Sequence, residues 1–276
     1  MQSRSTSEIK RHLVTDSDSI QYGLASKIND LRIPSGLTSD KKIEKAYYDK
    51  DLKAEEAVTK LYDEGIEISK LSKVLSIGML GIQKGRRIVP TKWSITATDQ
   101  IISSDLIKKL KNFDSVNFYQ VYSYGHLGNI YSIILIPDKT WCFEMHEAWI
   151  DRVGHVDFET DMEIAGKSRS YPNIGGSFFA ARLAVAEYLF QNRKSASIIV
   201  FREIRPQYLL PVGVWQIREG IRKAMSKAPK VFDSLEKALI NACSIMSVSK
   251  KEWINNSKLL IFVKSQKKII DYFEKT

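Results

Sequence analysis

Apolar residues recur along this chain at intervals that predict a helical region, a run of strands and a second helical region. From Asp40 to Leu80, leucine, isoleucine, valine and alanine return at steps of about three to five residues, as in helices with one buried face. Gly65 is expected to divide this stretch into two helices, and Gly78 to end the second. Residues 1–40 are polar and poor in periodicity, which predicts a flexible or peripheral arm.

The middle of the chain favours strands. Segments 116–124, 129–137 and 140–150 are rich in aromatic and β-branched residues, and turn residues separate them. Segment 197–204 is almost wholly apolar, which predicts a strand in the interior of a sheet. We predict an antiparallel sheet of about five strands, to which these four segments belong.

Helical patterns return in the second half. Segment 177–193 has apolar residues around more than one face, so we expect a buried helix in the core. Further helices are predicted over 214–227 and 234–246. Ser249 and Glu252 have the spacing of a capping box, which indicates the start of another helix.

The segment between the first helices and the strands, residues 85–100, is expected to be mostly extended. β-branched residues from Ile88 to Thr96 favour a strand or loop, and Pro90 confines it to an edge. Thr98 is expected to cap a helix that runs on to about residue 111.

The length and composition fit a single α+β domain. We interpret residues 41–264 as that domain, with a helical N-terminal region and a sheet packed with helices, and residues 265–276 as a tail. The two cysteines lie far apart and predict no zinc ribbon. The strongest apolar stretch, 130–136, is too short to span a bilayer. We therefore expect a soluble, cytoplasmic protein without a membrane partner.

The formal net charge of +10 favours a polyanionic partner, with nucleic acid before an anionic membrane surface. A lysine-rich proteome would give the same balance without such a partner. The charge alone therefore leaves both interpretations open.

A short motif lies near the C-terminus. Gln266, Ile269, Tyr272 and Phe273 match the pattern Q-x-x-aliphatic-x-x-aromatic-aromatic. The pattern resembles the PIP motif, with which replication and repair proteins bind the DNA sliding clamp PCNA. In a 3₁₀ turn, side chains at i and i+3 eclipse, so Ile269 and Tyr272 would project together beside Phe273. The alternative is a terminal helix whose apolar residues pack on the domain. We favour the clamp because a terminal segment is free to bind.

Four internal segments resemble the archaeal Nre family of DNA-repair proteins: GRRIVPTKWSITATD (85–99), WCFEMHEAW (141–149), GGSFFAARLAVAEYL (175–189) and VGVWQIREGIRKAM (212–225). The lead-in over 51–81 resembles the family too. The resemblance implies a DNA-damage-response factor with a C-terminal clamp-binding motif, but it implies no reaction. Family members usually begin with a cysteine-rich segment that this sequence lacks, so we expect a short or truncated member.

A basic cluster in the first of these segments is the candidate site for nucleic acid. It consists of Lys84, Arg86, Arg87 and Lys92, with Trp93 beside them. Basic side chains neutralise phosphates, and an exposed tryptophan stacks on an unpaired base. The alternative is that Trp93 belongs to the core and the charges form a solvated rim.

Two further features have plainer interpretations. A second basic stripe fits one helix face and is typical of a solvated surface, with DNA phosphate as the alternative; it consists of Arg218, Arg222, Lys223, Lys227 and Lys230. Gly175 and Gly176 precede a helix and could place a phosphate at its N-terminus, although close packing is the first interpretation.

The candidates for catalysis are Glu144, His146 and Glu147. On a strand, Glu144 and His146 share one face with Cys142, and carboxylates that converge could hold Mg²⁺ or Mn²⁺. No nuclease signature surrounds them, so we assign neither a metal site nor a cofactor.

These observations predict a nucleoid-associated DNA-repair factor that binds DNA and is tethered to PCNA as an adaptor. The alternative is a metal-dependent nucleic-acid-processing enzyme that the clamp recruits. A more distant alternative is a metabolic enzyme whose tail matches by accident. Whether the protein is an enzyme is left open.

Overall fold

The computed structural model describes residues 2–5, 28–32, 40–167, 170–209 and 212–265. The chain divides into two compact units, Met1–Tyr48 and Asp49–Thr276. In the first unit, strands β1 (Gln2–Ser5) and β2 (Ile28–Arg32) pair antiparallel, and helix α1 spans Lys41–Tyr48. The division falls a little after residue 40, where we expected the arm to end.

The second unit is built on a mixed sheet. Among the described residues it has six strands, in the order β10-β4-β5-β9-β6-β7. Their bounds are β4 (Tyr119–His126), β5 (Asn129–Ile136), β6 (Cys142–Ile150), β7 (Val156–Ile164), β9 (Ser197–Ile204) and β10 (Lys230–Phe232). A small parallel pair, β3 (Asp114–Ser115) and β8 (Lys194–Ser195), lies outside this sheet.

The α+β class is confirmed, and β9 is interior as predicted. The antiparallel pattern holds for every pair in this sheet except β6 and β9, which run parallel. The parallel pair arises because the chain leaves the sheet after β7 and returns through a long helix. Such a crossover lets β9 enter between β5 and β6 in the direction of β6.

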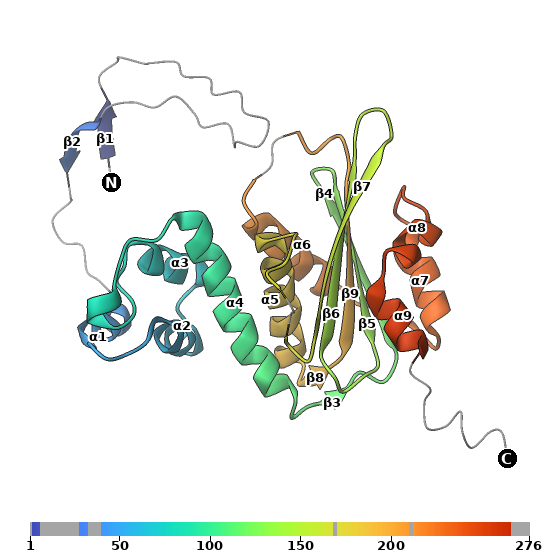
Figure 1. Cartoon of the computed structure of the whole chain (residues 1–276), viewed down its shortest axis with the longest axis horizontal. Helices are drawn as coiled ribbons and strands as arrows, with labels where there is room; N and C mark the ends of the chain where they lie inside the picture. Colours follow the sequence, from blue (N-terminus) through green and yellow to red (C-terminus); the bar gives the residue numbers. More distant parts are fainter. Residues whose placement is uncertain (1, 6–27, 33–39, 168–169, 210–211, 266–276) are drawn as a thin grey trace. The chain divides into compact units, whose positions relative to one another are not determined.

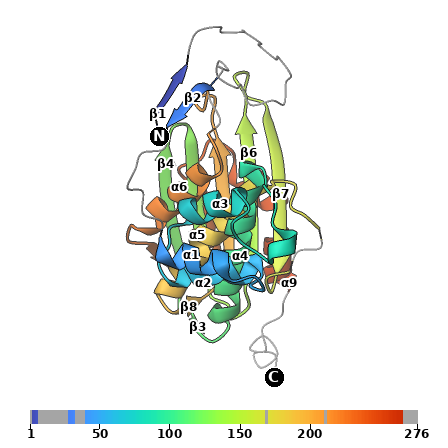
Figure 2. The ribbon, with the colours of Figure 1, turned by 90° about the vertical axis from the view of Figure 1, so that its left-hand side faces the viewer.

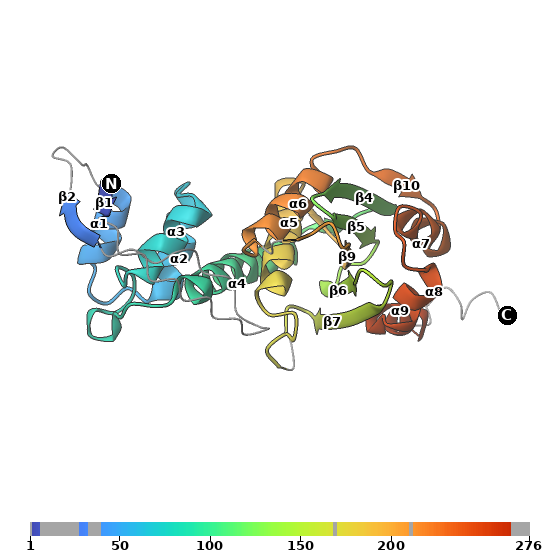
Figure 3. The ribbon, with the colours of Figure 1, turned by 90° about the horizontal axis from the view of Figure 1, so that it is seen from above.

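Helices cover both faces of the sheet (Figure 3). Helices α5 (Gly176–Gln191) and α6 (Trp215–Met225) lie on one face. The other face is covered by α7 (Leu235–Cys243), α8 (Lys250–Asn255) and α9 (Lys258–Ser265). The capping box predicted at Ser249 begins α8, and its two reciprocal hydrogen bonds are present.

A further helical layer packs on α5. Helix α4 (Thr91–Leu110) lies beside α5, and α2 (Ala54–Asp63) and α3 (Ile68–Ser76) pack on α4 (Figures 1 and 2). A short 3₁₀ helix, η1 (Gln83–Gly85), precedes α4. None of the described helices is both long and apolar enough to cross a membrane.

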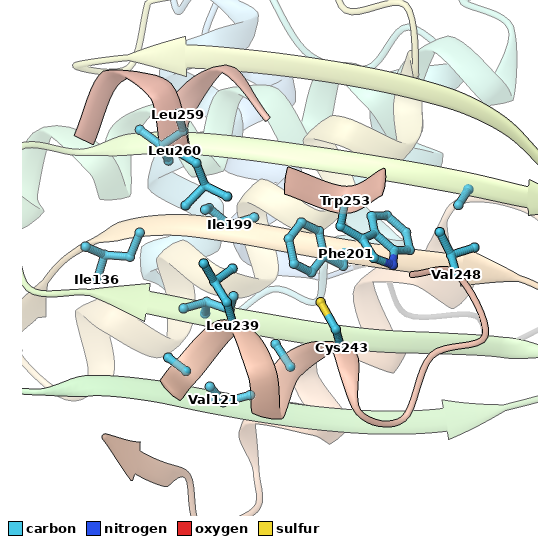
Figure 4. Close-up of a cluster of buried hydrophobic side chains, with 14 of the residues drawn as sticks. Val121, Ile136, Ile199, Phe201, Leu239, Cys243, Val248, Trp253, Leu259 and Leu260 are labelled. Carbon is cyan, nitrogen blue, oxygen red and sulfur yellow. The ribbon is translucent and has the colours of Figure 1, made fainter. Parts of the chain in front are cut away.

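The two faces of the sheet hold separate cores. Between the sheet and α7–α9, the indole of Trp253 packs against Phe201, with ring centroids 4.7 Å apart, and Leu239 and Val248 belong to the same cluster (Figure 4). On the opposite face, α5 lies between the sheet and α4 with Leu183 wholly buried. The prediction that α5 is a core helix is confirmed.

The start of α4 differs from the prediction. We expected extended structure over residues 88–96, but the helix begins at Thr91, directly after Pro90. The hydroxyl residues fit the helix because their side chains donate hydrogen bonds to carbonyl oxygens one turn earlier. The Ser94 hydroxyl donates to the Thr91 carbonyl at 2.9 Å, and the Thr98 hydroxyl donates to the Ser94 carbonyl at 2.7 Å. Packing against α3 and α5 thus overrides the local strand propensity.

The burial of α5 leads to a stability prediction. Truncating Leu183 to alanine leaves a cavity in the core and should lower the free energy of unfolding by about 2–5 kcal/mol. Ile240 on α7 is 53% exposed, so Ile240→Ala is a control that should change stability by less than about 0.5 kcal/mol. Urea melts measure both variants, and equal effects would show that the core is misassigned.

Candidate nucleic-acid interface

The loop before α4 is held in place by hydrogen bonds to its own surroundings. Two hydrogen bonds join Val89 to Ser76. The Val89 amide donates to the Ser76 carbonyl at 2.8 Å, and the Ser76 hydroxyl donates to the Val89 carbonyl at 2.7 Å. Gly78 allows this approach, because a Cβ there would lie 2.8 Å from the Arg87 carbonyl oxygen. The loop is therefore tied firmly to the end of α3.

The basic cluster divides into two kinds of residue. Arg86 donates from Nε to the Gly81 carbonyl at 2.6 Å and from Nη2 to the Asp49 carbonyl at 2.8 Å, so it fastens the loop. Lys84, Arg87 and Lys92 are exposed instead. These three side chains remain able to meet phosphates.

Trp93 lies in the first turn of α4 and is 62% exposed, so it does not belong to the core. The neighbouring Ile88 is 82% exposed. Both side chains leave apolar surface open to a partner. We name Lys84, Arg87, Lys92 and Trp93 the α4 surface.

The N-terminal parts of helices α4, α5 and α6 lie close together. A Cβ at Gly176, the first residue of α5, would lie 2.9 Å from Oγ1 of Thr96 on α4 and 3.1 Å from Cγ1 of Val214, which precedes α6. The Gly-Gly pair therefore serves close packing, as in our first interpretation. None of the three helices has an acidic residue in its first turn, and Trp215 of α6 is 51% exposed. No pattern in the sequence pointed to Trp215 as an exposed side chain.

The second basic stripe is only partly a solvated face. Arg218 is buried and hydrogen-bonds to Asp99 of α4, and Arg222 donates two hydrogen bonds to Glu187 of α5, at 2.8 and 2.7 Å. Both arginines therefore join α6 to its neighbours. The other three residues of the stripe are exposed, but only Lys223 lies on α6: Lys227 follows the end of the helix and Lys230 begins β10, so the prediction of one helix face is wrong.

All three candidates for catalysis are buried. Glu144 and His146 share one face of β6 as predicted, both wholly buried beneath α8 and α9. Glu144 accepts hydrogen bonds from the Ser257 hydroxyl at 2.5 Å and from the Lys258 amide at 2.7 Å, so its carboxylate caps the N-terminus of α9. Nε2 of His146 lies 3.0 Å from Oε2 of Glu144 but is not aligned for a hydrogen bond.

Glu147 faces the other side of β6. It accepts a hydrogen bond from Nη1 of Arg202 at 2.6 Å, and Arg202 in turn donates to Asn129 at 2.9 and 2.7 Å. The three candidates thus do not converge. Among the described residues, no group of three or more His, Cys, Asp or Glu side chains is placed to hold a metal ion.

Burial by itself would raise the pKa of Glu144. The adjacent imidazole of His146, the Ser257 hydroxyl and the Leu259 amide outweigh that effect and hold the pKa below its ordinary value. The carboxylate is therefore ionised in the folded protein at neutral pH and stabilises the α9 cap.

The clamp motif, Gln266, Ile269, Tyr272 and Phe273, lies outside the described residues. Nothing in the fold tests it, and it stays a prediction.

The chain belongs to the archaeal Nre family. Residues 1–153 match a family model described as "Archaeal Nre, N-terminal", and residues 163–272 match one described as "Archaeal Nre, C-terminal". The resemblance inferred from the sequence segments is thereby confirmed. The first match ends in the turn between β6 and β7, and the second begins near the end of β7.

The chain is similar to curated proteins that are named DNA repair proteins. It is 39% identical to DNA repair protein NreA of Archaeoglobus fulgidus over 216 residues, which cover 77% of this chain and 54% of that protein. It is 36% identical to NreB of the same organism over 244 residues, 87% of this chain and 62% of that protein. It is 36% identical to NreA of Haloferax volcanii over 192 residues, which cover 67% of this chain and 46% of that protein.

The chain thus spans about half to three-fifths of the length of the curated relatives it matches. No solved structure matches it.

The Glu144 cap predicts a pH dependence. Because the folded pKa is depressed, the stability that the carboxylate adds is present above its ordinary pKa of 4.5 and is lost as the pH falls through the lower folded pKa. Urea melts between about pH 6 and pH 3 should therefore show a shallower loss of stability in Glu144→Gln than in the native protein. Glu159→Gln, at an exposed site on β7, should retain the native slope. Equal slopes in the native protein and Glu144→Gln would contradict this role.

Proposed function

We propose that this protein is a DNA-damage-response factor that binds DNA with its α4 surface and is tethered to the sliding clamp by residues 266–273. The observation that carries the proposal is membership of a family whose curated relatives are named DNA repair proteins. The DNA contact and the clamp contact are the parts of this proposal that experiments must decide.

The α4 surface supports a DNA contact through its chemistry. Lys84 and Arg87 are exposed in the segment that leads into α4, and Lys92 and Trp93 are exposed in its first turn, which is positively polarised and holds no acidic residue. Phosphates favour such a site, and the tryptophan offers a stacking face to an unpaired base. The net charge of +10 adds a long-range attraction to nucleic acid.

We rank an adaptor above a metal-dependent enzyme. Glu144 is engaged by the start of α9, and Glu147 by Arg202 on the opposite face of β6. Each carboxylate thus satisfies a buried partner whose loss would be costly. An adaptor needs only to hold DNA and the clamp at the same time, because two tethered sites raise the effective concentration of each partner.

The α4 surface gives the first test of DNA binding. Arg87→Ala/Lys92→Ala removes two phosphate contacts, so the slope of log K against log salt should fall by about two for a short oligonucleotide. Lys108→Ala/Lys111→Ala removes the same charge from the other end of α4 and should leave the slope unchanged. Fluorescence anisotropy over a salt series measures both, and identical slopes in the two double variants would assign the DNA contact to another surface.

The clamp contact is tested with the tail alone. A peptide of residues 264–276 should bind PCNA with micromolar affinity, about −8 kcal/mol. Phe273→Ala should weaken it about thirty-fold, because buried aromatic anchors dominate small interfaces. Lys267→Ala is the control and should act mainly on the salt-dependent association rate.

The alternative for the tail makes an opposite prediction. If residues 266–276 pack on the domain, deleting them should lower the melting temperature, and the isolated peptide should ignore the clamp. If they form the clamp tag, the deletion should end clamp binding and leave the melting temperature almost unchanged. Calorimetry of the peptide beside a thermal melt of the shortened protein separates the two.

A further inference from the structure

A small pocket opens beside α4, between that helix, the start of α5 and the segment after β7. It has a volume of about 310 Å³, at the lower end of the range for small-molecule sites. Its lining combines polar and aromatic side chains: Gln100, Ser104, Glu163, Arg182, Tyr171 and Phe179. No motif in the sequence points to these residues.

A buried ion pair forms the polar wall of the pocket. Arg182 and Glu163 are only 3% and 4% exposed. Nε of Arg182 donates to Oε1 of Glu163 at 2.7 Å, and Nε1 of Trp141 donates to the same oxygen at 2.6 Å. Nη1 of Arg182 donates to the hydroxyls of Ser103 at 2.7 Å and Ser104 at 3.1 Å. These hydrogen bonds from neighbouring elements hold the pair in place.

Two polar atoms of this pair remain available. Among the described residues, the hydrogen bonds of the pair use Oε1, Nε and Nη1, so Oε2 of Glu163 and Nη2 of Arg182 make none. Gly166 also lines the pocket, and a Cβ built on it would lie 4.0 Å from Nη2 of Arg182. One unused acceptor and one unused donor thus belong to residues that line the pocket.

The aromatic part of the pocket offers flat apolar surface. Tyr171 at the rim is 66% exposed, and its ring centroid lies 5.8 Å from that of the buried Phe179. A ligand that enters here would meet an aromatic ring on one side and polar groups at its edge. The wall carries one positive and one negative charge, so the pocket favours an uncharged ligand over a phosphate.

We propose that this pocket binds a single unpaired nucleobase. A base is flat and uncharged, and its pairing edge carries a hydrogen-bond donor next to an acceptor, which complements Oε2 of Glu163 and Nη2 of Arg182. Aromatic contact from Tyr171 supplies the stacking that a base loses when it leaves a helix. The amide of Gln100 at the mouth adds a donor and an acceptor.

The position of the pocket relative to the α4 surface supports this ligand. Trp93, Gln100 and Ser104 lie at i, i+7 and i+11 on α4 and so share one face of the helix. Trp93 and Gln100 are about 10 Å apart along the helix axis, at about 1.5 Å per residue. A strand whose phosphates meet Arg87 and Lys92 would therefore carry its next bases past the mouth of the pocket.

The inference rests on the proposed DNA binding, but a free nucleoside has the same chemistry as a base in DNA. The test uses the full chain. One experiment compares a duplex that carries one bulged base with the same duplex that carries an abasic site at that position. A second experiment adds free deoxynucleosides at millimolar concentration. Anisotropy follows the duplexes and calorimetry follows the nucleosides. We expect the bulged base to be bound about tenfold more tightly than the abasic site.

Variants locate that preference in the pocket. Gln100→Trp places a large side chain at the mouth and should reduce the tenfold preference to less than about twofold. Gln191→Trp, the same change at the exposed far end of α5, should leave it intact. Tyr171→Ala should remove most of the preference and Tyr171→Phe should keep it. Because Tyr171 is largely exposed, its variants stay folded even if Gln100→Trp lowers the melting temperature.

The outcomes separate this inference from the proposed function. Equal affinity for the bulged and abasic duplexes, with no uptake of nucleosides, overturns the base pocket and leaves DNA binding at the α4 surface standing. A preference that persists in both Gln100→Trp and Tyr171→Ala overturns the base pocket in the same way. Nucleoside binding that Tyr171→Ala abolishes, without any binding of DNA, supports the base pocket and overturns the proposed DNA contact.

Discussion

Helix α5 is buried on nearly every side, and this burial constrains the elements around it. A helix between a sheet and a second helical layer cannot leave a charge unpaired, because an isolated buried charge costs several kcal/mol. Arg182 is paired with Glu163 of β7, and Glu187 accepts hydrogen bonds from Tyr62 of α2 and Arg222 of α6. One apolar helix with two charges thus fixes the register of three neighbours.

The two segments recognised by the family models form one sheet. Strands β4, β5 and β6 come from the N-terminal match, β9 and β10 come from the C-terminal match, and β7 lies mostly between the two. Because β9 lies between β5 and β6, neither segment retains a complete set of strand partners without the other. The strands that the two matched segments contribute to this sheet therefore belong to one folding unit rather than to separate domains.

The same constraint connects the fold to the candidate sites. The residue that anchors α5 to β7, Arg182, also presents its remaining donor to the pocket beside Tyr171. The start of α5 requires Gly176 so that α4 and α6 can begin beside it, which brings the first turns of three helices to one end. A site assembled this way sits on rigid elements, as precise recognition of a ligand edge requires.

By itself the sequence determined the class of the fold, the core helix α5 and four of the six strands of the main sheet, and the resemblance of several segments indicated the family. The fold class, the helix and the strands depend on periodicity and local composition, which a linear pattern records. It could also place Glu144 and His146 on one face, since strands alternate. Only the tertiary structure decided that β6 and β9 run parallel, that Pro90 precedes a helix, and that Arg86 fastens a loop while Arg87 remains exposed. The pocket lined by Glu163 and Arg182 could not be predicted from the sequence either, because its residues come from three separate segments and only packing brings their side chains together.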